Sequence, residues 1–336
     1  MEKFDEAITC SKRQLSLARE LESIPIEIKA LYNLGNVWHA KGRIVMNEYA
    51  GVSCLISTSS FKINDDLYFK QELDNSFEKA THYYEENLLL SRQIDDKASE
   101  GRALGQLGNV NYRVGNWRKA IDYHTARLKI AQKLKDLSGE RRALANLANA
   151  YAGDGRLDLA IDFYTRALQI ARRTKEYEAE AQACWSLAAA HDLLDNHSLA
   201  LDFQKRHLSL AEKLGDKFGQ AKSSLNLAPM YQKLGQTSLS KQCAARAKEL
   251  AFSLNDESMF ENAVNVYKQV CESNSQETDL TTFLPDALNK AEHQSTKIYE
   301  KTKNNDKLNI PESIISGCAS DDEFTDKSSS ASHLVV

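Results

Sequence analysis

The sequence predicts an all-α protein, a right-handed superhelical solenoid of stacked helical hairpins with 40-residue repeats and a disordered C-terminal tail. Similar stretches begin 40 residues apart at Ala103, Ala143, Ala183 and Ser223, and an earlier copy begins at Ala30. Glycine and proline are scarce, with 14 and 4 residues among 336, which favours helices over turn-rich sheets. A repeat of this length cannot bury its apolar face alone, so successive units must stack against one another.

Each repeat is predicted to hold two helices joined by a turn, most clearly over residues 103–136. Leu104 and Leu107 recur at helical spacing in a first helix, helix A. Gly115 and Asn116 interrupt that pattern, and an amphipathic second helix, helix B, begins at Trp117. A small residue recurs on helix A where helix B must cross closely, at Gly35, Gly108, Ala148, Ala188 and Ala228.

Helix B begins at matching places along the chain, namely Phe4, Phe77, Trp117, Leu157, His197 and Thr237. Since the first of these lies at the start, the chain opens inside a helix B without its own helix A. That start predicts a frayed N-terminal end, in a shortened product or in a fragment. Pro229 falls inside a helix A, where it should kink the helix at a cost of ~3 kcal/mol.

The pattern divides the chain into three parts. Residues 1–256 form the repeat domain, with an insertion at about 44–74 that we expect to be a long loop with room for a short helix. Residues 257–300 carry a weaker helical pattern and should cap the stack as degenerate helices. From 301 to 336, Lys, Asn, Asp and Ser dominate, which predicts disorder. The final Leu334-Val335-Val336 has the form of a strand-adding ligand for a PDZ groove.

Composition bounds the class of protein. The net charge of −4 gives no general case for nucleic acid binding or direct membrane insertion. Six cysteines are scattered without a C-x-x-C pair, which is typical of reduced thiols in a cytoplasmic protein. The eight histidines show no metal-ligand spacing, and no phosphate loop or nucleophile elbow occurs, so we expect neither a cofactor nor an enzyme.

A stripe of polar residues is predicted on the A helices, which line the concave groove of such repeats. An Asn amide can bond both C=O and N–H groups, so a ladder of amides grips an extended peptide backbone without reading its sequence. Arg and Lys beside the ladder would pair with carboxylates of an acidic peptide. The candidate peptide-binding residues are Lys29, Asn33, Asn36, Arg102, Gln106, Asn109, Arg142, Asn146, Asn149, Trp185 and Lys222.

The ladder weakens along the chain, because Ala189 and Pro229 replace its asparagines, so we expect the ligand over the first three A helices. A plainer interpretation of the stripe is a solvated helix face or hydrogen bonds between repeats. For Trp185, packing and a hot-spot contact with a ligand stay open. The remaining aromatic residues at helical spacing are expected in the core, namely Trp38, Tyr112, Trp117, Tyr151, Tyr164 and Tyr231.

These markers resemble the tetratricopeptide repeat, lengthened by about six residues beyond its usual ~34. Four stretches are more specifically similar to the Pins/LGN family of spindle-orientation scaffolds and G-protein-signalling modulators. The similarity covers roughly residues 1–255, and the stretches are Phe4-Asp-Glu-Ala-Ile8, 30–42, Tyr83-Tyr-Glu-Glu-Asn-Leu88 and 140–149.

The resemblance implies a groove that takes acidic, elongated segments of Inscuteable-like or NuMA/Mud-like proteins, in a protein recruited to the cell cortex during cell polarity and asymmetric cell division. It implies at most an indirect link to Gα subunits. The family's GoLoco motif needs Phe-Phe-x-Leu-Leu followed by Asp-Asp-Gln-Arg, and Asp321-Asp-Glu-Phe324 is a poor match. Two alternatives stay open: a regulator with nucleotide-dissociation-inhibitor activity through the tail, and a cargo adaptor of the kinesin-light-chain type.

Overall fold

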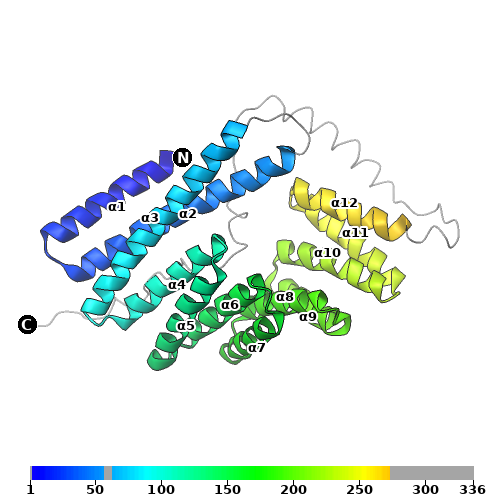
Figure 1. Ribbon diagram of the computed structural model, residues 1–336. Coiled ribbons are helices and arrows are strands. Elements are labelled where there is room, and N and C mark those ends of the chain that lie inside the picture. Colours follow the sequence, from blue (N-terminus) through cyan, green and yellow to red (C-terminus); the bar gives the residue numbers. More distant parts are fainter. Residues whose placement is uncertain (1, 57–62, 273–336) are drawn as a thin grey trace, which may run out of the picture. The chain divides into compact units, whose positions relative to one another are not determined.

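Twelve helices follow one another along the described part of the chain (Figure 1). The computed structural model describes residues 2–56 and 63–272, and no strand occurs among them. All twelve helices belong to one compact unit, 1–276. They are α1 (Glu2–Glu20), α2 (Ile24–Ile56), α3 (Ile63–Gln93), α4 (Lys97–Arg113), α5 (Trp117–Leu134), α6 (Leu137–Gly153), α7 (Leu157–Thr174), α8 (Tyr177–Leu193), α9 (His197–Leu214), α10 (Lys217–Lys233), α11 (Thr237–Ser253) and α12 (Glu257–Glu272).

The helices alternate between two types, and each packs against the next along the chain. Helices α2, α4, α6, α8, α10 and α12 correspond to helix A of the repeat, and the odd-numbered helices correspond to helix B. A-type helices also contact one another, α2 with α4, α4 with α6, and α10 with α12. A stack curves toward the side on which its elements lie closer together, so the A-type helices form the inner, concave side.

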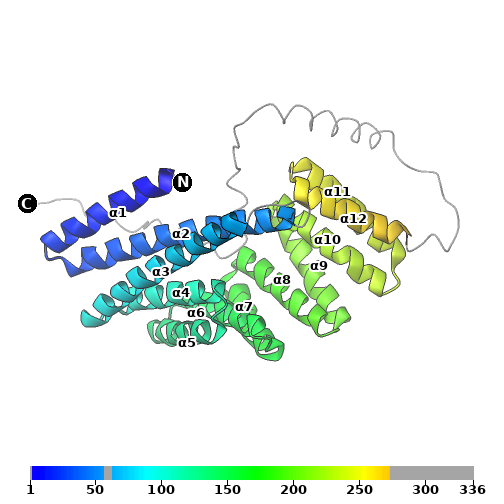
Figure 2. The ribbon, with the colours of Figure 1, turned by 45° about the horizontal axis from the view of Figure 1, so that its top comes forward.

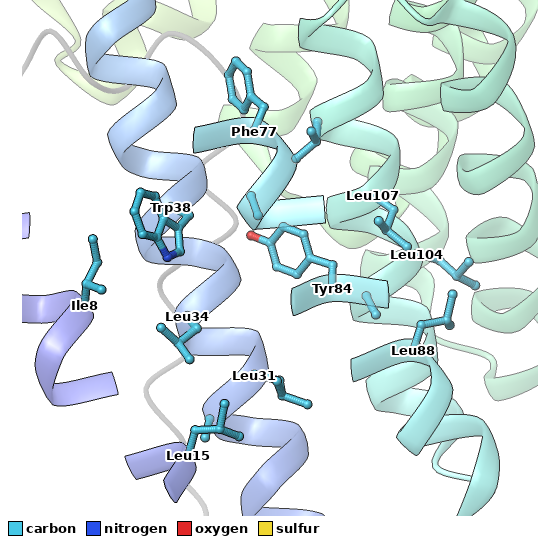
Figure 3. Close-up of a cluster of buried hydrophobic side chains, with 14 residues drawn as sticks. Ile8, Leu15, Leu31, Leu34, Trp38, Phe77, Tyr84, Leu88, Leu104 and Leu107 are labelled. Atoms are coloured by element: carbon cyan, nitrogen blue, oxygen red, sulfur yellow. The ribbon is translucent and has the colours of Figure 1, made fainter. Parts of the chain in front are cut away.

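Apolar side chains fill the space between successive hairpins. In the N-terminal cluster, Leu34 and Trp38 of α2 lie toward Ile8 and Leu15 of α1, while Leu31 lies on the side of α2 where α3 places Tyr84 (Figure 3). The predicted small residue explains this approach, since a Cβ at residue 35 would overlap the ring that α3 places there. The same contact recurs one repeat later, between residue 108 on α4 and the imidazole at 124 on α5.

The turns repeat as regularly as the helices. Each junction from a B-type to the next A-type helix passes through one residue in the left-handed region, as at Lys135, Lys175 and Gly215. An aspartate follows in most of these turns and caps the next helix, as where Asp136 accepts a hydrogen bond from the backbone N–H of Gly139 at 2.9 Å. The left-handed residue ends one helix and the aspartate begins another, which sets the repeat length.

The expectation of a long loop at 44–74 is wrong. Instead α2 continues to Ile56 and α3 begins at Ile63, so these two helices project beyond the other hairpins (Figure 2). Their extensions pack together, because Val45 is buried and Lys41 pairs with Glu72 at 2.7 Å. Helix α10 likewise runs through its internal proline from residue 217 to 233 without a break.

The last described helix, α12, differs from the earlier A-type helices at one position. The place where other A-type helices carry Gly or Ala is occupied here by Lys268, whose side chain is exposed. That residues 257–300 cap the stack stays a prediction. The second capping helix near 283–299 and the tail 301–336 lie outside the described residues.

Candidate peptide-binding groove

The polar residues predicted for the groove all lie on A-type helices, on the inner side of the stack. On the first three of these helices they are spaced by four and then three residues, so each set occupies one helix face. The sets are Lys29, Asn33 and Asn36 on α2, Arg102, Gln106 and Asn109 on α4, and Arg142, Asn146 and Asn149 on α6, followed by Trp185 on α8 and Lys222 on α10.

A hydrogen-bond network joins the amides of α2, α4 and α6. Gln106 Nε2 donates to the hydroxyl of Tyr32 at 3.1 Å and to Asn36 Oδ1 at 3.4 Å. Asn109 Nδ2 donates to Gln106 Oε1 at 3.0 Å, and Asn146 Nδ2 donates to Asn109 Oδ1, also at 3.0 Å. The structure thus brings the predicted amides of three helices together, and the hydrogen bonds between repeats that the plainer interpretation anticipated are present.

Burial separates these amides into two groups. Gln106 and Asn146 are 6% and 9% exposed, so they serve first to hold the ladder together. The asparagines at 33, 36, 109 and 149 are half-buried and reach the surface of the groove. Asn33 turns partly away from the ladder, because its Nδ2 donates to Gln14 Oε1 of α1 at 3.3 Å.

Two tyrosines on B-type helices orient the outer asparagines. Tyr84 donates its hydroxyl to Asn36 Oδ1 at 2.8 Å, and Tyr164 donates to Asn149 Oδ1 at 2.5 Å. Burial raises the pKa of Tyr164 to about 12, so its hydroxyl keeps the proton that it donates. Within the described residues the nitrogens of both amides have no partner, which leaves two N–H donors on each for a ligand.

The two tyrosines were not predicted as part of the groove, although their position in the repeat could have indicated them. They occupy the position on helix B that crosses the small residue of helix A, where one repeat has His124 and another Gln204. Of the six aromatic residues expected in the core, Trp38, Tyr164 and Tyr231 are buried, whereas Tyr112, Trp117 and Tyr151 are half-buried, and Tyr84 was not among the six. Core placement and a polar role at the ring's edge are compatible, because a tyrosine buries its ring and extends its hydroxyl.

Cations flank the amides on the same helix faces. Lys29 and Arg102 are exposed, and the guanidinium of Arg102 donates to Ser99 Oγ at 2.9 Å. Arg142 is half-buried beside Asn146 on α6. The inner side of the first three A-type helices therefore combines amide donors with positive charge.

The groove changes character at α8. Trp185 is half-buried, and the ammonium of Lys222 from α10 lies 4.4 Å from the centroid of its ring. Ala189, one turn further along α8, and Pro229 on α10 are exposed where the earlier helices carry asparagine. This end of the inner face thus presents apolar surface under a cation instead of amides.

Among residues 2–56 and 63–272, no group of three or more His, Cys, Asp and Glu side chains could hold a metal ion. None of the described helices is long and apolar enough to span a bilayer.

Models of the tetratricopeptide repeat match residues 103–138 and 140–213 of the chain. The chain is 35% identical over 115 residues to G-protein-signaling modulator 1 of Homo sapiens, a match that covers 34% of this chain and 16% of that protein. The protein of the same name from Mus musculus is 34% identical over 81 residues, which is 24% of this chain and 10% of that protein. The chain therefore matches only a small part of these relatives' lengths.

Two solved structures share the fold at low sequence identity. BtubC (BKLC) from P. vanneervenii superposes with a TM-score of 0.60 at 17% identity, covering 75% of this chain and 92% of that one. The apo form of RapI superposes with a TM-score of 0.51 at 14% identity, covering 60% and 77%. With the repeat models and the helical architecture, these likenesses establish the chain as an all-α solenoid of tetratricopeptide repeats.

Proposed function

We propose that the chain is a non-catalytic scaffold that binds an extended, acidic peptide of a partner protein along its A-type helices. Tetratricopeptide repeats and the similarity to a G-protein-signaling modulator support a protein-interaction role. The observation that carries the finer proposal is the amide network across α2, α4 and α6, with unengaged donors at its edges and cations beside it.

The geometry suits a peptide in extended conformation. The nitrogens of Asn36 and Asn149 supply donors for peptide carbonyl groups, and Asn109 retains a second amide hydrogen beside the one it gives to Gln106. Because the network holds these amides in place before binding, little side-chain entropy is lost when the peptide arrives. Lys29 and the arginines at 102 and 142 would then pair with carboxylates of the partner.

The apolar end of the groove supplies the register of the peptide. A large apolar side chain placed next to a carboxylate would contact Trp185 while the carboxylate meets Lys222. A partly exposed tryptophan under a cation is the kind of residue that dominates binding energies at interfaces. This makes Trp185 a hot-spot residue in the proposed complex.

The similarity to G-protein-signaling modulator 1 and the Pins/LGN-like stretches favour Inscuteable-like or NuMA/Mud-like partners. In that role the protein would act in spindle orientation and cell polarity at the cell cortex, with an indirect link to Gα subunits. A direct regulator that acts through residues 257–336 is the alternative, and a nucleotide-release assay on a Gα subunit with the full chain distinguishes it. Slower nucleotide release would support the alternative.

The proposal is tested by fluorescence anisotropy with a labelled acidic segment of an Inscuteable-like protein and the full chain. Lys29→Glu and Arg142→Glu are each expected to weaken binding by about tenfold or more, because a cation–carboxylate pair becomes a repulsive pair. Arg118→Glu makes the same charge change at an exposed site on α5 and should leave the affinity within error.

Thermal unfolding is measured on all three variants, because half-buried Arg142 also has a structural environment. Equal affinities of the wild type and Lys29→Glu would contradict the proposal, since that side chain is exposed and its loss leaves the fold intact. A peptide of the same composition with lysine in place of its acidic residues should not bind.

A further inference from the structure

Large apolar side chains are exposed at the tips of three consecutive turns. These turns join α5 to α6, α7 to α8 and α9 to α10, and their tips lie together at one edge of the stack because A-type and B-type helices alternate in direction. Leu134 and Phe218 are 50% and 44% exposed. We call the five exposed side chains the B–A edge, and they are Leu134, Leu137, Tyr177, Leu214 and Phe218.

Contacts between neighbouring turns make this edge continuous. The ammonium of Lys213 lies 3.5 Å from the ring centroid of Tyr177, which connects the last turn to the middle one. Arg141 of α6 pairs with Glu176 at 2.8 Å, which connects the middle turn to the first. The B–A edge is therefore one surface of the folded stack.

The charges around the B–A edge are unbalanced. Five of its cations are exposed and take part in no ion pair within the described residues, whereas its acids are mostly engaged. Asp136 and Asp216 cap helices, and Glu176 is paired, which leaves Glu178 as the acid without such a role. The unpaired cations are Lys133, Lys135, Arg173, Lys175 and Lys217.

At the opposite edge, two exposed leucines of α7 and α9 lie among acidic side chains. Leu159 and Leu199 are exposed near the start of α7 and α9. Exposed aspartates accompany them, namely Asp158, Asp162 and Asp202. Around these two leucines the apolar exposure is therefore accompanied by acids, whereas at the B–A edge it is accompanied by unpaired cations.

We infer that the B–A edge adsorbs to the surface of an anionic phospholipid bilayer. Apolar side chains on protruding turns enter the boundary between headgroups and acyl chains, while lysines and arginine beside them meet the anionic headgroups. A fluid bilayer adapts to side chains that project from separate turns, whereas a folded protein would need matching hollows at each of them. The protein's overall charge of −4 conceals this local excess of positive charge.

Vesicle sedimentation with the full chain tests the inference. The protein is expected to pellet with vesicles that contain phosphatidylserine, to remain in solution with phosphatidylcholine alone, and to be released by raised salt. Leu134→Ser with Phe218→Ser should weaken binding by about tenfold. The matched double variant Leu159→Ser with Leu199→Ser, at the opposite edge, should bind as the wild type does.

A second matched pair of double variants tests the contribution of charge to vesicle binding. Lys175→Glu with Lys217→Glu should weaken binding by about tenfold or more, whereas Lys119→Glu with Lys241→Glu makes the same change at the opposite edge and should not. Equal effects of the two charge variants would show attraction by net charge and overturn the inference. Failure of the protein to bind phosphatidylserine vesicles would also overturn the inference. The same holds if a B–A edge variant still binds vesicles and loses only self-association or a contact with another protein. Peptide binding in the groove should be unchanged in every variant, which keeps this result separate from the proposed function.

Discussion

The side chain of Asn146 on α6 donates a hydrogen bond to Asn109 on α4 at 3.0 Å, across 37 residues of chain. Both residues belong to the inner face, and the bond links two repeats at the surface proposed to hold the peptide. Stability of the stack and readiness of the groove therefore depend on the same amides.

Replacing Asn146 by alanine tests this coupling. The free energy of unfolding should fall by about 1 kcal/mol, the typical contribution of one hydrogen bond. Peptide affinity should fall as well, although Asn146 is only 9% exposed, because Asn109 loses the donor that orients it. Chemical denaturation and peptide titration measure the two effects. Asn262→Ala, at an exposed site on α12, is the control and should change neither.

Tyr164→Phe removes one hydroxyl and keeps the ring in the core. Asn149 would lose the donor that fixes its carbonyl oxygen, so we expect a loss of about 1 kcal/mol in stability and weaker peptide binding. Tyr123→Phe removes a half-buried hydroxyl that forms no hydrogen bond within the described residues, and it should leave the affinity unchanged. If both variants bind alike, the tyrosine does not prepare the groove.

Two glycines of α4 should respond in opposite ways to alanine. At Gly108 a Cβ would overlap the imidazole of His124, so Gly108→Ala should lower stability by roughly 1–3 kcal/mol. At Gly101 the nearest atom to a new Cβ is a methyl group of Ile130 at 3.4 Å. Gly101→Ala should therefore raise stability by roughly 0.5–1 kcal/mol, since glycine disfavours a helix interior. Thermal unfolding of the two variants is the measurement.

Stability should fall in acid because of a buried histidine. Burial is the main cause that lowers the pKa of His124 to about 3, with Arg127 contributing, whereas the unfolded chain titrates near 6.5. Between these values the unfolded state binds a proton that the folded state lacks, so stability rises with pH and is lost progressively below about 6.5.

His124→Tyr provides the comparison, since equivalent positions in two other repeats carry tyrosine. Below pH 6.5, the number of protons taken up on unfolding should be smaller by about one in the variant than in the wild type. Burial also lowers the pKa of His39 to about 3, so this residue would still contribute to the pH dependence of stability in the variant. Chemical denaturation at several pH values measures the slope, and an unchanged slope would contradict the assignment.

The sequence was sufficient to predict the fold because the repeat places the same small residues and turns in each copy. The position of Gly35 and Gly108 indicated where helices cross, and the structure confirms both contacts. The insertion at 44–74 was not predictable in this way, since it breaks the period. Its helices depend on packing against each other, through contacts such as Lys41 with Glu72, which join residues far apart in the sequence.

Part of the groove followed from helical spacing alone, because residues three and four apart share a face. The spacing does not show which amides are engaged. That depends on the residue that the neighbouring helix places beneath each asparagine, tyrosine at 84 and 164 but histidine at 124. Local sequence defines the face of one helix, and the pairing across it requires the assembled stack.

Lys268 has a consequence for any helix that crosses α12. The equivalent residue of the earlier A-type helices is Gly or Ala, against which a B-type helix packs closely, and an ammonium side chain at this place leaves no room for the same close crossing. An engineer who wished to lengthen this receptor by appending consensus units would first have to replace that lysine with alanine.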